Sequence, residues 1–288
     1  MAVSPAHRWG QIIGEVMEAG VRPILEDFAA RHGLYLDKQG ERPCRKGRKC
    51  TWIDANGNAH DLDFVLERGG TAEKTGLPVA FIETAWRRYT KHSRNKAQEI
   101  QGAILPLAQT YSRSAPFKGA ILAGVFTEGA LAQMRSLGFN ILFFPYEMIL
   151  EVFRRFGLDA SSEEKTPDSR FQAKVRRYER LTEEQRGRLP VALMEANKPE
   201  VNRFLGALTA VISRHIERIS VLPLHGAAQE CLTIEEAMSY IERYEDPGIV
   251  QPVQRYEIQV RFSNGDVIEG RFGDKQGAIA FLAGYNAC

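Results

Sequence analysis

Two short apolar runs, each beside one acidic residue, constrain the fold of this chain more than any other feature. Asp63 opens the run Phe-Val-Leu, and Glu83 closes the run Val-Ala-Phe-Ile. Apolar runs of this length are typical of strands. A carboxylate on an apolar strand face is costly to bury unless it is ligated or paired. We therefore expect neighbouring strands that carry two acids at their ends.

A cationic segment follows Glu83, with five basic side chains before the next acid. Two carboxylates at strand ends can hold a hard divalent cation by oxygen ligation. Cations beside such a metal are where a phosphodiester would sit. The combination predicts a phosphodiesterase site before any family is considered. The alternative is that Asp63 only belongs to a turn and Glu83 only pairs with Arg87. The basic residues are Arg87, Arg88, Lys91, Arg94 and Lys96.

Composition narrows the class of protein only modestly. The chain of 288 residues is 44% hydrophobic and 26% charged, which is typical of a soluble globular protein. Its net charge of +2 neither demands nor excludes nucleic acid. No apolar run approaches the roughly 20 residues of a membrane span, and no secretion signal is visible. The four cysteines form no disulfide framework, so we expect a cytoplasmic protein.

Cys44 and Cys50 flank the basic stretch Arg-Lys-Gly-Arg-Lys. Two thiols make half a zinc site, and the nearest other ligand type, His60, lies across an expected hairpin. The alternative is a basic loop in which the cysteines are small apolar spacers. Its cations could contact a phosphate backbone or be solvated. They are Arg42, Arg45, Lys46, Arg48 and Lys49.

The first half of the chain alternates between strand and helix patterns. Helical periodicity covers residues 8–32, where Pro23 is expected to start a second helical piece and Gly33 to end it. Two strands are expected about the Asn56-Gly57 turn, and another from Leu77 to about residue 86. The sequence then predicts a helix from Ser93, strands at 119–126 and 140–145, and between these a helix capped by Thr127.

The second half divides into a helical region and a small α/β appendage. Residues from about 147 to 220 are expected to be helical, and a hairpin is expected about residues 263–266. No sequence repeat is apparent. The predicted fold class is α/β, with a mixed β-sheet flanked by helices. The predicted divisions are an α/β core at 1–150, a helical region at 151–220 and the appendage at 221–288.

This arrangement resembles the PD-(D/E)XK nuclease superfamily, the core of many restriction endonucleases. The family pattern has an Asp at the start of one strand and Glu, any residue and Lys on the adjacent strand. Asp63 in LDFVL matches the first acid, and Glu83 in AFIETAW matches the second. The resemblance covers residues from about 8 to about 150, and it implies a restriction-endonuclease-like core.

One position departs from the family pattern, because Ala85 stands where the family has its lysine. Some members of the superfamily move a catalytic side chain to the following helix. Lys96 in the first turn of that helix is our first candidate for the missing cation, Lys91 the second and Arg87 the third. Gln98 and Glu99 are further positions at which family variants place a catalytic group. The bland alternative is that Lys96 is an ordinary solvated lysine.

The resemblance implies a Mg²⁺-dependent endonuclease that cuts duplex DNA, most like a type II restriction enzyme. It implies Asp63 and Glu83 as metal ligands, with Glu15 of the first helix as a further ligand. Two alternatives stay open: a catalytically inactive nuclease-like DNA-binding subunit, and an α/β protein unrelated to nucleic acid. Cutting both strands implies a homodimer by analogy. The expected DNA contacts are Arg87, Arg88, Lys91 and Arg94.

Overall fold

The computed structural model describes residues 4–89, 93–224, 226–245 and 256–285. Contacts divide the chain into two compact units. The first comprises Met1–Tyr111 and Pro116–Leu208, and the second comprises Ser112–Ala115 and Thr209–Cys288. This differs from the expected three-part division, because the helices that follow residue 150 pack on the first unit instead of standing alone. Within the described residues, no helix is both long and apolar enough to cross a bilayer.

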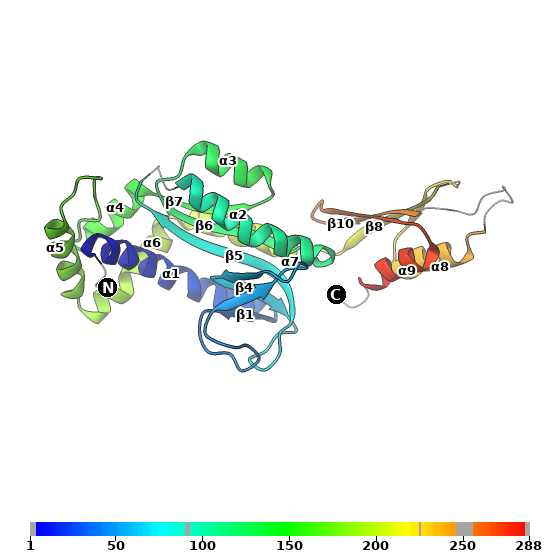
Figure 1. Cartoon of the computed structure of the whole chain (residues 1–288), viewed down its shortest axis with the longest axis horizontal. Coiled ribbons are helices and arrows are strands. Elements are labelled where there is room, and N and C mark those ends of the chain that lie inside the picture. Colours follow the sequence, from blue (N-terminus) through cyan, green and yellow to red (C-terminus); the bar gives the residue numbers. More distant parts are fainter. Residues whose placement is uncertain (1–3, 90–92, 225, 246–255, 286–288) are drawn as a thin grey trace. The chain divides into compact units, whose positions relative to one another are not determined.

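A mixed five-stranded sheet, in the order β1-β4-β5-β6-β7, forms the centre of the first unit (Figure 1). The first three strands of this order are antiparallel, and β5, β6 and β7 are parallel. This confirms the expected α/β class with a mixed sheet. The strands are β1 (Leu34–Lys38), β4 (Phe64–Arg68), β5 (Leu77–Arg87), β6 (Phe117–Gly124) and β7 (Asn140–Pro145).

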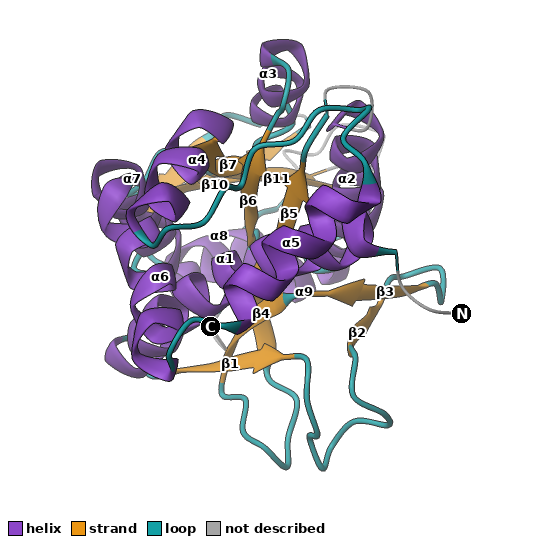
Figure 2. Cartoon of the chain, turned by 90° about the vertical axis from the view of Figure 1, so that its left-hand side faces the viewer, coloured by secondary structure: helices purple, strands orange, loops and turns teal. Residues whose placement is uncertain are grey.

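Helices cover both faces of this sheet (Figures 1 and 2). On one face α2 and α3 pack together, and the sequence-predicted cap Thr127 accepts a hydrogen bond from the Ala130 amide at the start of α3. On the other face α1 contacts β5, α5 and α6. The helices are α1 (Pro5–Arg31), α2 (Ser93–Thr110), α3 (Glu128–Ser136), α4 (Tyr146–Arg155), α5 (Asp168–Glu179), α6 (Glu183–Ala196) and α7 (Lys198–Ile212), with a short 3₁₀ turn, η2 (Ser112–Ser114).

The central strand β5 is buried on both faces, which explains its continuous apolar run. Phe81 and Ala85 point into a cluster with α2 and α3, together with Val65 of β4. Their neighbours along the strands, Ile82 and Phe64, are fully buried as well. The two-sided core fixes the register of β5, since a slip of one residue would exchange the faces. That register decides where the acid at its end lies.

The first helix is continuous, so the expectation of a second helical piece at Pro23 is wrong. Pro23 lies inside α1, which runs on to Arg31 and ends before Gly33 as predicted. Proline removes one hydrogen bond of the helix interior and costs about 3 kcal/mol there. The apolar face nevertheless continues across it, with Val21 and Leu25 both buried. Burial of this face offsets the local loss.

The second unit is a four-stranded antiparallel sheet in the order β11-β10-β8-β9, with two helices. Its first strand begins at Ile216, so the helix expected up to residue 220 is wrong there. Ile219 and Val221, two residues apart on that strand, are fully buried. This alternation is typical of a strand, but it directly follows a helical pattern and was read as part of the helix. The hairpin about residues 263–266 is confirmed. The elements are β8 (Ile216–Pro223), β9 (Gln229–Cys231), α8 (Ile234–Arg243), β10 (Tyr256–Phe262), β11 (Val267–Phe272) and α9 (Lys275–Ala283).

This unit contains a structural repeat that the sequence did not reveal. Each half is two strands followed by a helix, and the first strands of the halves, β8 and β10, pair antiparallel at the centre. The turn within each half differs in length, and few residues match, which is why no repeat is visible in the sequence. Three pairs of matching positions are separated by the same number of residues along the chain. They are the N-caps Thr233 and Asp274, the buried Ala237 and Ala278, and the buried Ile241 and Leu282.

Gly124 at the end of β6 provides a test of the packing beside the cleft described below. Its φ is +97°, and a Cβ there would lie 2.1 Å from the Arg87 carbonyl oxygen and 2.6 Å from the Trp86 ring. We expect Gly124→Ala to destabilise the protein by about 2–4 kcal/mol in denaturant unfolding. Gly129→Ala is the control, since nothing lies within 4 Å of a Cβ there. A Gly124→Ala protein as stable as Gly129→Ala would contradict this packing.

Candidate functional site

Asp63 lies at a bend between two sheets. The expected hairpin about Asn56-Gly57 is present as β2 (Cys50–Ile53) and β3 (Ala59–Leu62), which form their own small sheet. The chain turns at Asp63 and enters β4 of the main sheet. The backbone amide and hydroxyl of Thr84 donate hydrogen bonds to Asp63 Oδ2 at 2.7 and 2.6 Å. The bend and the two donors together fix the orientation of this carboxylate.

Glu83 lies beside Asp63 on the adjacent strand. The antiparallel register pairs Phe64 with Ile82, so the next residues outward are Asp63 and Glu83. The Glu83 residue is only 7% exposed. The pKa of Glu83 is raised to about 8, chiefly by burial and next by the charge of Asp63, while the charge of Lys96 acts in the opposite direction. The expected pair of carboxylates on neighbouring strands is therefore present.

Lys96 approaches this pair from the first turn of α2. Its Nζ lies 4.0 Å from Glu83 Oε2 and 3.3 Å from Glu99 Oε2. The Lys96 side chain is 20% exposed, which is well below the exposure of a solvated surface lysine. Ala85, at the family's lysine position, is buried against α2. Lys91, the second candidate for the missing cation, lies outside the described residues.

An open cleft of about 750 Å³ is lined by Asp63 and Lys96, whereas Glu83 is not among its lining residues. Its walls come from α1, the Asp63 bend, the end of β5 and the start of α2. Gly10 and Gly14 of α1 line it, and no atom lies within 4 Å of a Cβ built at Gly14. The helix backbone is therefore open to a bulky ligand along this wall. The charged lining residues are Glu15, Glu18, Asp63, Arg87, Arg88, Lys96 and Glu99.

Glu18 is the acid of α1 whose pKa is raised, chiefly by burial and next by the charge of Asp63. Glu15, the predicted third ligand, also lines the cleft, but its carboxylate pairs with Arg8 at 2.7 Å. Sequence reasoning missed Glu18, although it lies three residues after Glu15 and hence on the same face of a helix.

The described residues hold no group of three or more His, Cys, Asp or Glu side chains that could bind a metal ion. Asp63 and Glu83 lie next to each other on adjacent strands, while the Glu15 carboxylate pairs with Arg8. Two carboxylates suit Mg²⁺, which keeps several waters and is often held by one or two carboxylates and a substrate phosphate. They do not suit a closed zinc site, which needs four protein ligands.

The basic segment after Glu83 divides into distinct environments. Arg88 is stacked, with its guanidinium 4.8 Å from the Phe171 ring centre and 5.5 Å from that of Tyr89. Arg87 lies 3.9 Å from Glu99 and donates to the Trp86 carbonyl. Arg94 is exposed. The stack on α5 gives Arg88 a structural contact that the sequence did not indicate.

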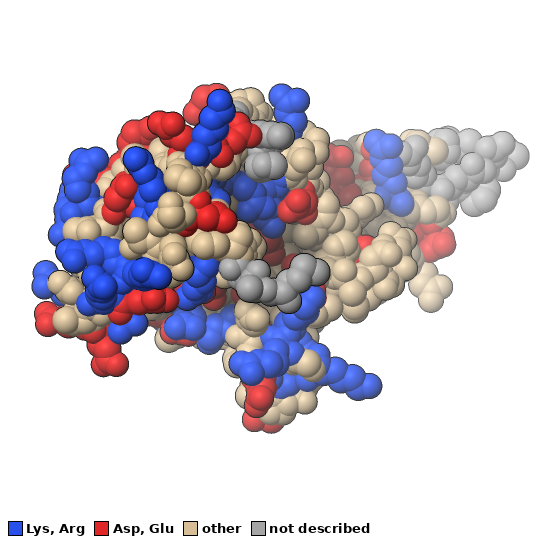
Figure 3. Space-filling view, turned by 60° about the vertical axis from the view of Figure 1, so that its left-hand side comes forward, with Lys and Arg blue, Asp and Glu red and all other residues tan. Residues whose placement is uncertain are grey.

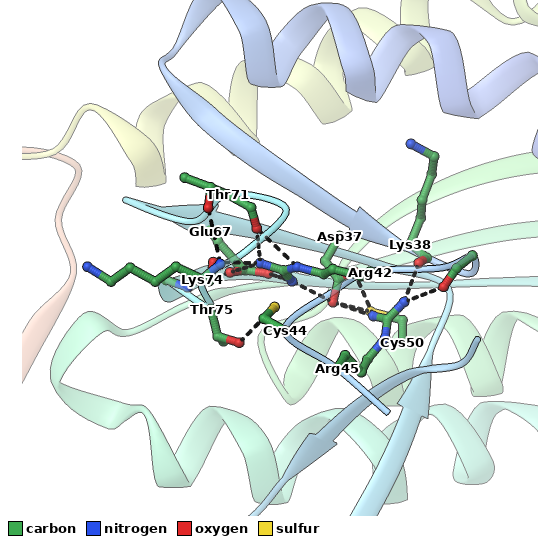
Figure 4. Close-up of polar contacts among 12 residues, drawn as sticks. Asp37, Lys38, Arg42, Cys44, Arg45, Cys50, Glu67, Thr71, Lys74 and Thr75 are labelled. Atoms are coloured by element: carbon green, nitrogen blue, oxygen red, sulfur yellow. Dashed lines mark hydrogen bonds and ion pairs between the residues drawn. The ribbon is translucent and has the colours of Figure 1, made fainter. Parts of the chain in front are cut away.

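The loop between Cys44 and Cys50 also differs from expectation. Arg42 is buried and the Arg45 side chain is only 10% exposed, because both are paired with buried acids (Figure 4). Burial and the neighbouring Asp37 raise the pKa of the Cys50 thiol, which donates a hydrogen bond to Asp37. A thiol held in its protonated form is a poor zinc ligand. Sequence reasoning missed these pairs because the partners are distant along the chain.

Comparisons with known proteins add little to this geometry. No family model matches the chain, and a search of curated proteins finds none that matches it. Among solved structures, the chain is similar to the crystal structure of a protein of unknown function, AF1548, at 14% sequence identity and a TM-score of 0.29. The similarity covers 68% of this chain and 98% of that chain. At that TM-score the similarity supports no statement about function.

The raised pKa of Glu83 predicts how the stability of the protein depends on pH in the absence of divalent metal. The folded protein keeps this proton up to about pH 8, whereas the unfolded chain loses it near the ordinary value of 4.5. Stability therefore falls as pH rises between these values, and Glu83→Gln removes that loss. In denaturant unfolding with EDTA, the quantity to measure is the free energy of unfolding of Glu83→Gln minus that of wild type. This difference should increase by roughly 2–4 kcal/mol as the pH rises from 5 to 8.5.

Glu99→Gln is the control for that measurement, because the Glu99 side chain is 61% exposed. Its difference from wild type should stay nearly constant across the same pH range. A constant difference for Glu83→Gln as well would show that Glu83 is not buried as a neutral acid.

Proposed function

We propose that this protein is a metal-dependent endonuclease that hydrolyses phosphodiester bonds in duplex DNA. The observation that carries the proposal is the pair Asp63 and Glu83 on adjacent strands beside an open cleft, with Lys96 at 4.0 Å from Glu83. The pair matches the acids of the PD-(D/E)XK pattern, and the mixed sheet between two helical layers is compatible with that core. Under this proposal the protein acts as a type II restriction enzyme.

The residues present fit a hard divalent cation such as Mg²⁺. Thr84 holds one oxygen of Asp63, while Oδ1 has no hydrogen bond among the described residues. A ligand carboxylate oriented in this way by outer hydrogen bonds is typical of metal sites. Glu83 adds a desolvated carboxylate, and among the described residues Lys96 provides its counter-charge. When bound, the metal supplies Lewis-acid chemistry toward a phosphate oxygen and a water.

The protein's own groups position the substrate and the attacking water. The ammonium of Lys96 is a mobile point charge on a flexible stem, and it can orient a water near the two carboxylates. Its pairing with Glu99 keeps Nζ on the cleft side of α2. Arg94 at the start of α2 and Arg87 at the end of β5 are available for phosphate contacts, which give affinity without reading sequence. Lys91 remains a further candidate for both roles.

The first prediction from this proposal concerns the two acids. Asp63→Ala and Glu83→Ala should each abolish cleavage of plasmid DNA in Mg²⁺ while the protein stays folded, as checked by circular dichroism. Glu195→Ala, an exposed acid on α6, is the control with the same change of charge. Cleavage by either variant at the wild-type rate would remove the proposed site.

Lys96 should act mainly on rate. Lys96→Ala should reduce single-turnover cleavage by about a hundredfold or more and change duplex affinity little, since a water-orienting group acts in the transition state. Arg94→Ala, in the same helical turn, should instead weaken affinity and lower the slope of log affinity against log salt by about 0.9. If Lys91→Ala shows the rate defect and Lys96→Ala does not, Lys91 supplies the cation.

A second candidate function follows from Ala85. Without a lysine on the strand, the fold could serve as a catalytically inactive DNA-binding subunit. Duplex binding by wild-type protein, with no cleavage in Mg²⁺ or Mn²⁺, would favour this alternative. A homodimer is part of the main proposal, because one site cuts one strand, and sedimentation of the DNA complex would test it.

A further inference from the structure

Two loops of the first unit project together away from the sheet (Figure 2). Residues 39–49 connect β1 to β2, and residues 69–76 connect β4 to β5. They contact each other, since the Cys44 amide donates to the Ala72 carbonyl at 3.4 Å. We refer to residues 39–49 and 69–76 together as the basic projection. Neither loop contributes a residue to the cleft described above.

Arg42 joins the two loops through a buried fork (Figure 4). Its Nη1 and Nη2 donate to the two carboxylate oxygens of Glu67 at 2.5 and 3.0 Å. Nη2 also donates to the carbonyl oxygens of Thr71 and Lys74 at 2.8 and 2.9 Å. Glu67 has no exposed surface, and its other contact is the Gly76 amide at 2.6 Å. One guanidinium therefore closes the second loop onto the first.

A second buried pair holds the base of the first loop. Both oxygens of Asp37 accept from Arg45 Nη1 at 2.6 Å, and Arg45 Nη2 donates to the carbonyl oxygens of Lys38 and Gly40. Asp37 Oδ2 also lies 3.0 Å from Arg42 Nη1. The four charges form one network, so the projection has a charged core in place of an apolar one. Buried networks of this kind give a defined geometry more than they give stability.

The outer surface of the projection is cationic. Lys46, Arg48, Lys49 and Lys74 are exposed, against two exposed acids within the loops, Glu41 and Glu73. Lys46 and Arg48 flank Gly47, which has a φ of +77°, and the Arg48 carbonyl accepts a hydrogen bond from the Gly40 amide at 2.8 Å. Neither makes an ion pair within the described part of the chain. Figure 3 shows lysine and arginine side chains around the lobe at the bottom of the view.

We propose that the basic projection is a DNA-contacting element that grips duplex DNA through its phosphate backbone at Lys46 and Arg48. The inference deepens the proposed function and rests on it for the choice of partner. A fixed loop keeps its cations in place before binding, so little ordering entropy is lost on contact. Exposed cations on such a scaffold suit a regular polyanion.

The test is duplex binding by the full-length protein, measured by fluorescence anisotropy across a salt titration in EDTA, where no hydrolysis occurs. The variant Lys46→Ser with Arg48→Ser removes two exposed charges and leaves the buried network intact. We expect affinity to fall by about tenfold or more, and the log–log salt slope to fall by about 1.8, from two lost phosphate contacts.

Arg186→Ser with Arg188→Ser is the matched control, because both are exposed on α6 and the same net charge is lost. If the two double variants have equal slopes of log affinity against log salt, the proposal that the basic projection contacts DNA is overturned, even if the wild type cuts DNA. A wild type that binds through Lys46 and Arg48 but never cuts would overturn the nuclease and leave the projection standing. The proposal for the basic projection would also be overturned if the protein bound only single strands or anionic vesicles, or did not bind duplex DNA.

Discussion

The antiparallel register between β4 and β5 is the constraint on which the candidate site depends. It places Phe64 opposite Ile82, and both are fully buried. A shift by one residue would move apolar side chains from one core layer to the other, at a cost of about 1.5–3 kcal/mol for each side chain that became exposed. Packing on both faces therefore fixes the position of Glu83 beside Asp63. The packing of the core therefore determines the geometry of the candidate site.

The same geometry makes the site energetically unfavourable by itself. Two carboxylates are held side by side, one of them desolvated, and the nearest counter-charge stands 4.0 Å away on a flexible stem. A shift of the Glu83 pKa from 4.5 to about 8 means that the folded protein holds a neutral acid near pH 7. Such a carboxylate has little structural value, because a leucine or glutamine there would pack at lower cost. Perturbed acids of this kind concentrate where a cation or a proton is handled.

Sequence patterns identified the elements that carry the site, because local period and buried strand character agree there. The acids, the helix from Ser93 and the cap Thr127 were all visible in short windows, whereas the bend at Asp63, which divides the expected second strand into β3 and β4, was not. The missed features depend on long-range partners. Arg42 is buried and Arg45 is mostly covered, although both are cationic residues of a polar loop, since the acids they pair with lie on β1 and β4. Pro23 and the strand at Ile216 show tertiary packing overriding a local signal.

Buried charge is used in two opposite ways in this chain. Around Arg42, two cations meet two acids in hydrogen-bonded pairs, and removing one partner would leave an uncompensated charge at a cost of about 3–5 kcal/mol. Around Glu83, within the part of the chain that the structure describes, the charges of Asp63 and Asp61 oppose ionisation and that of Lys96 favours it. The first arrangement is complete without a ligand and gives shape to the loops. The second lacks such a balance among the described residues, because Glu83 holds a proton near pH 7, and this difference separates a complete structural network from the proposed site.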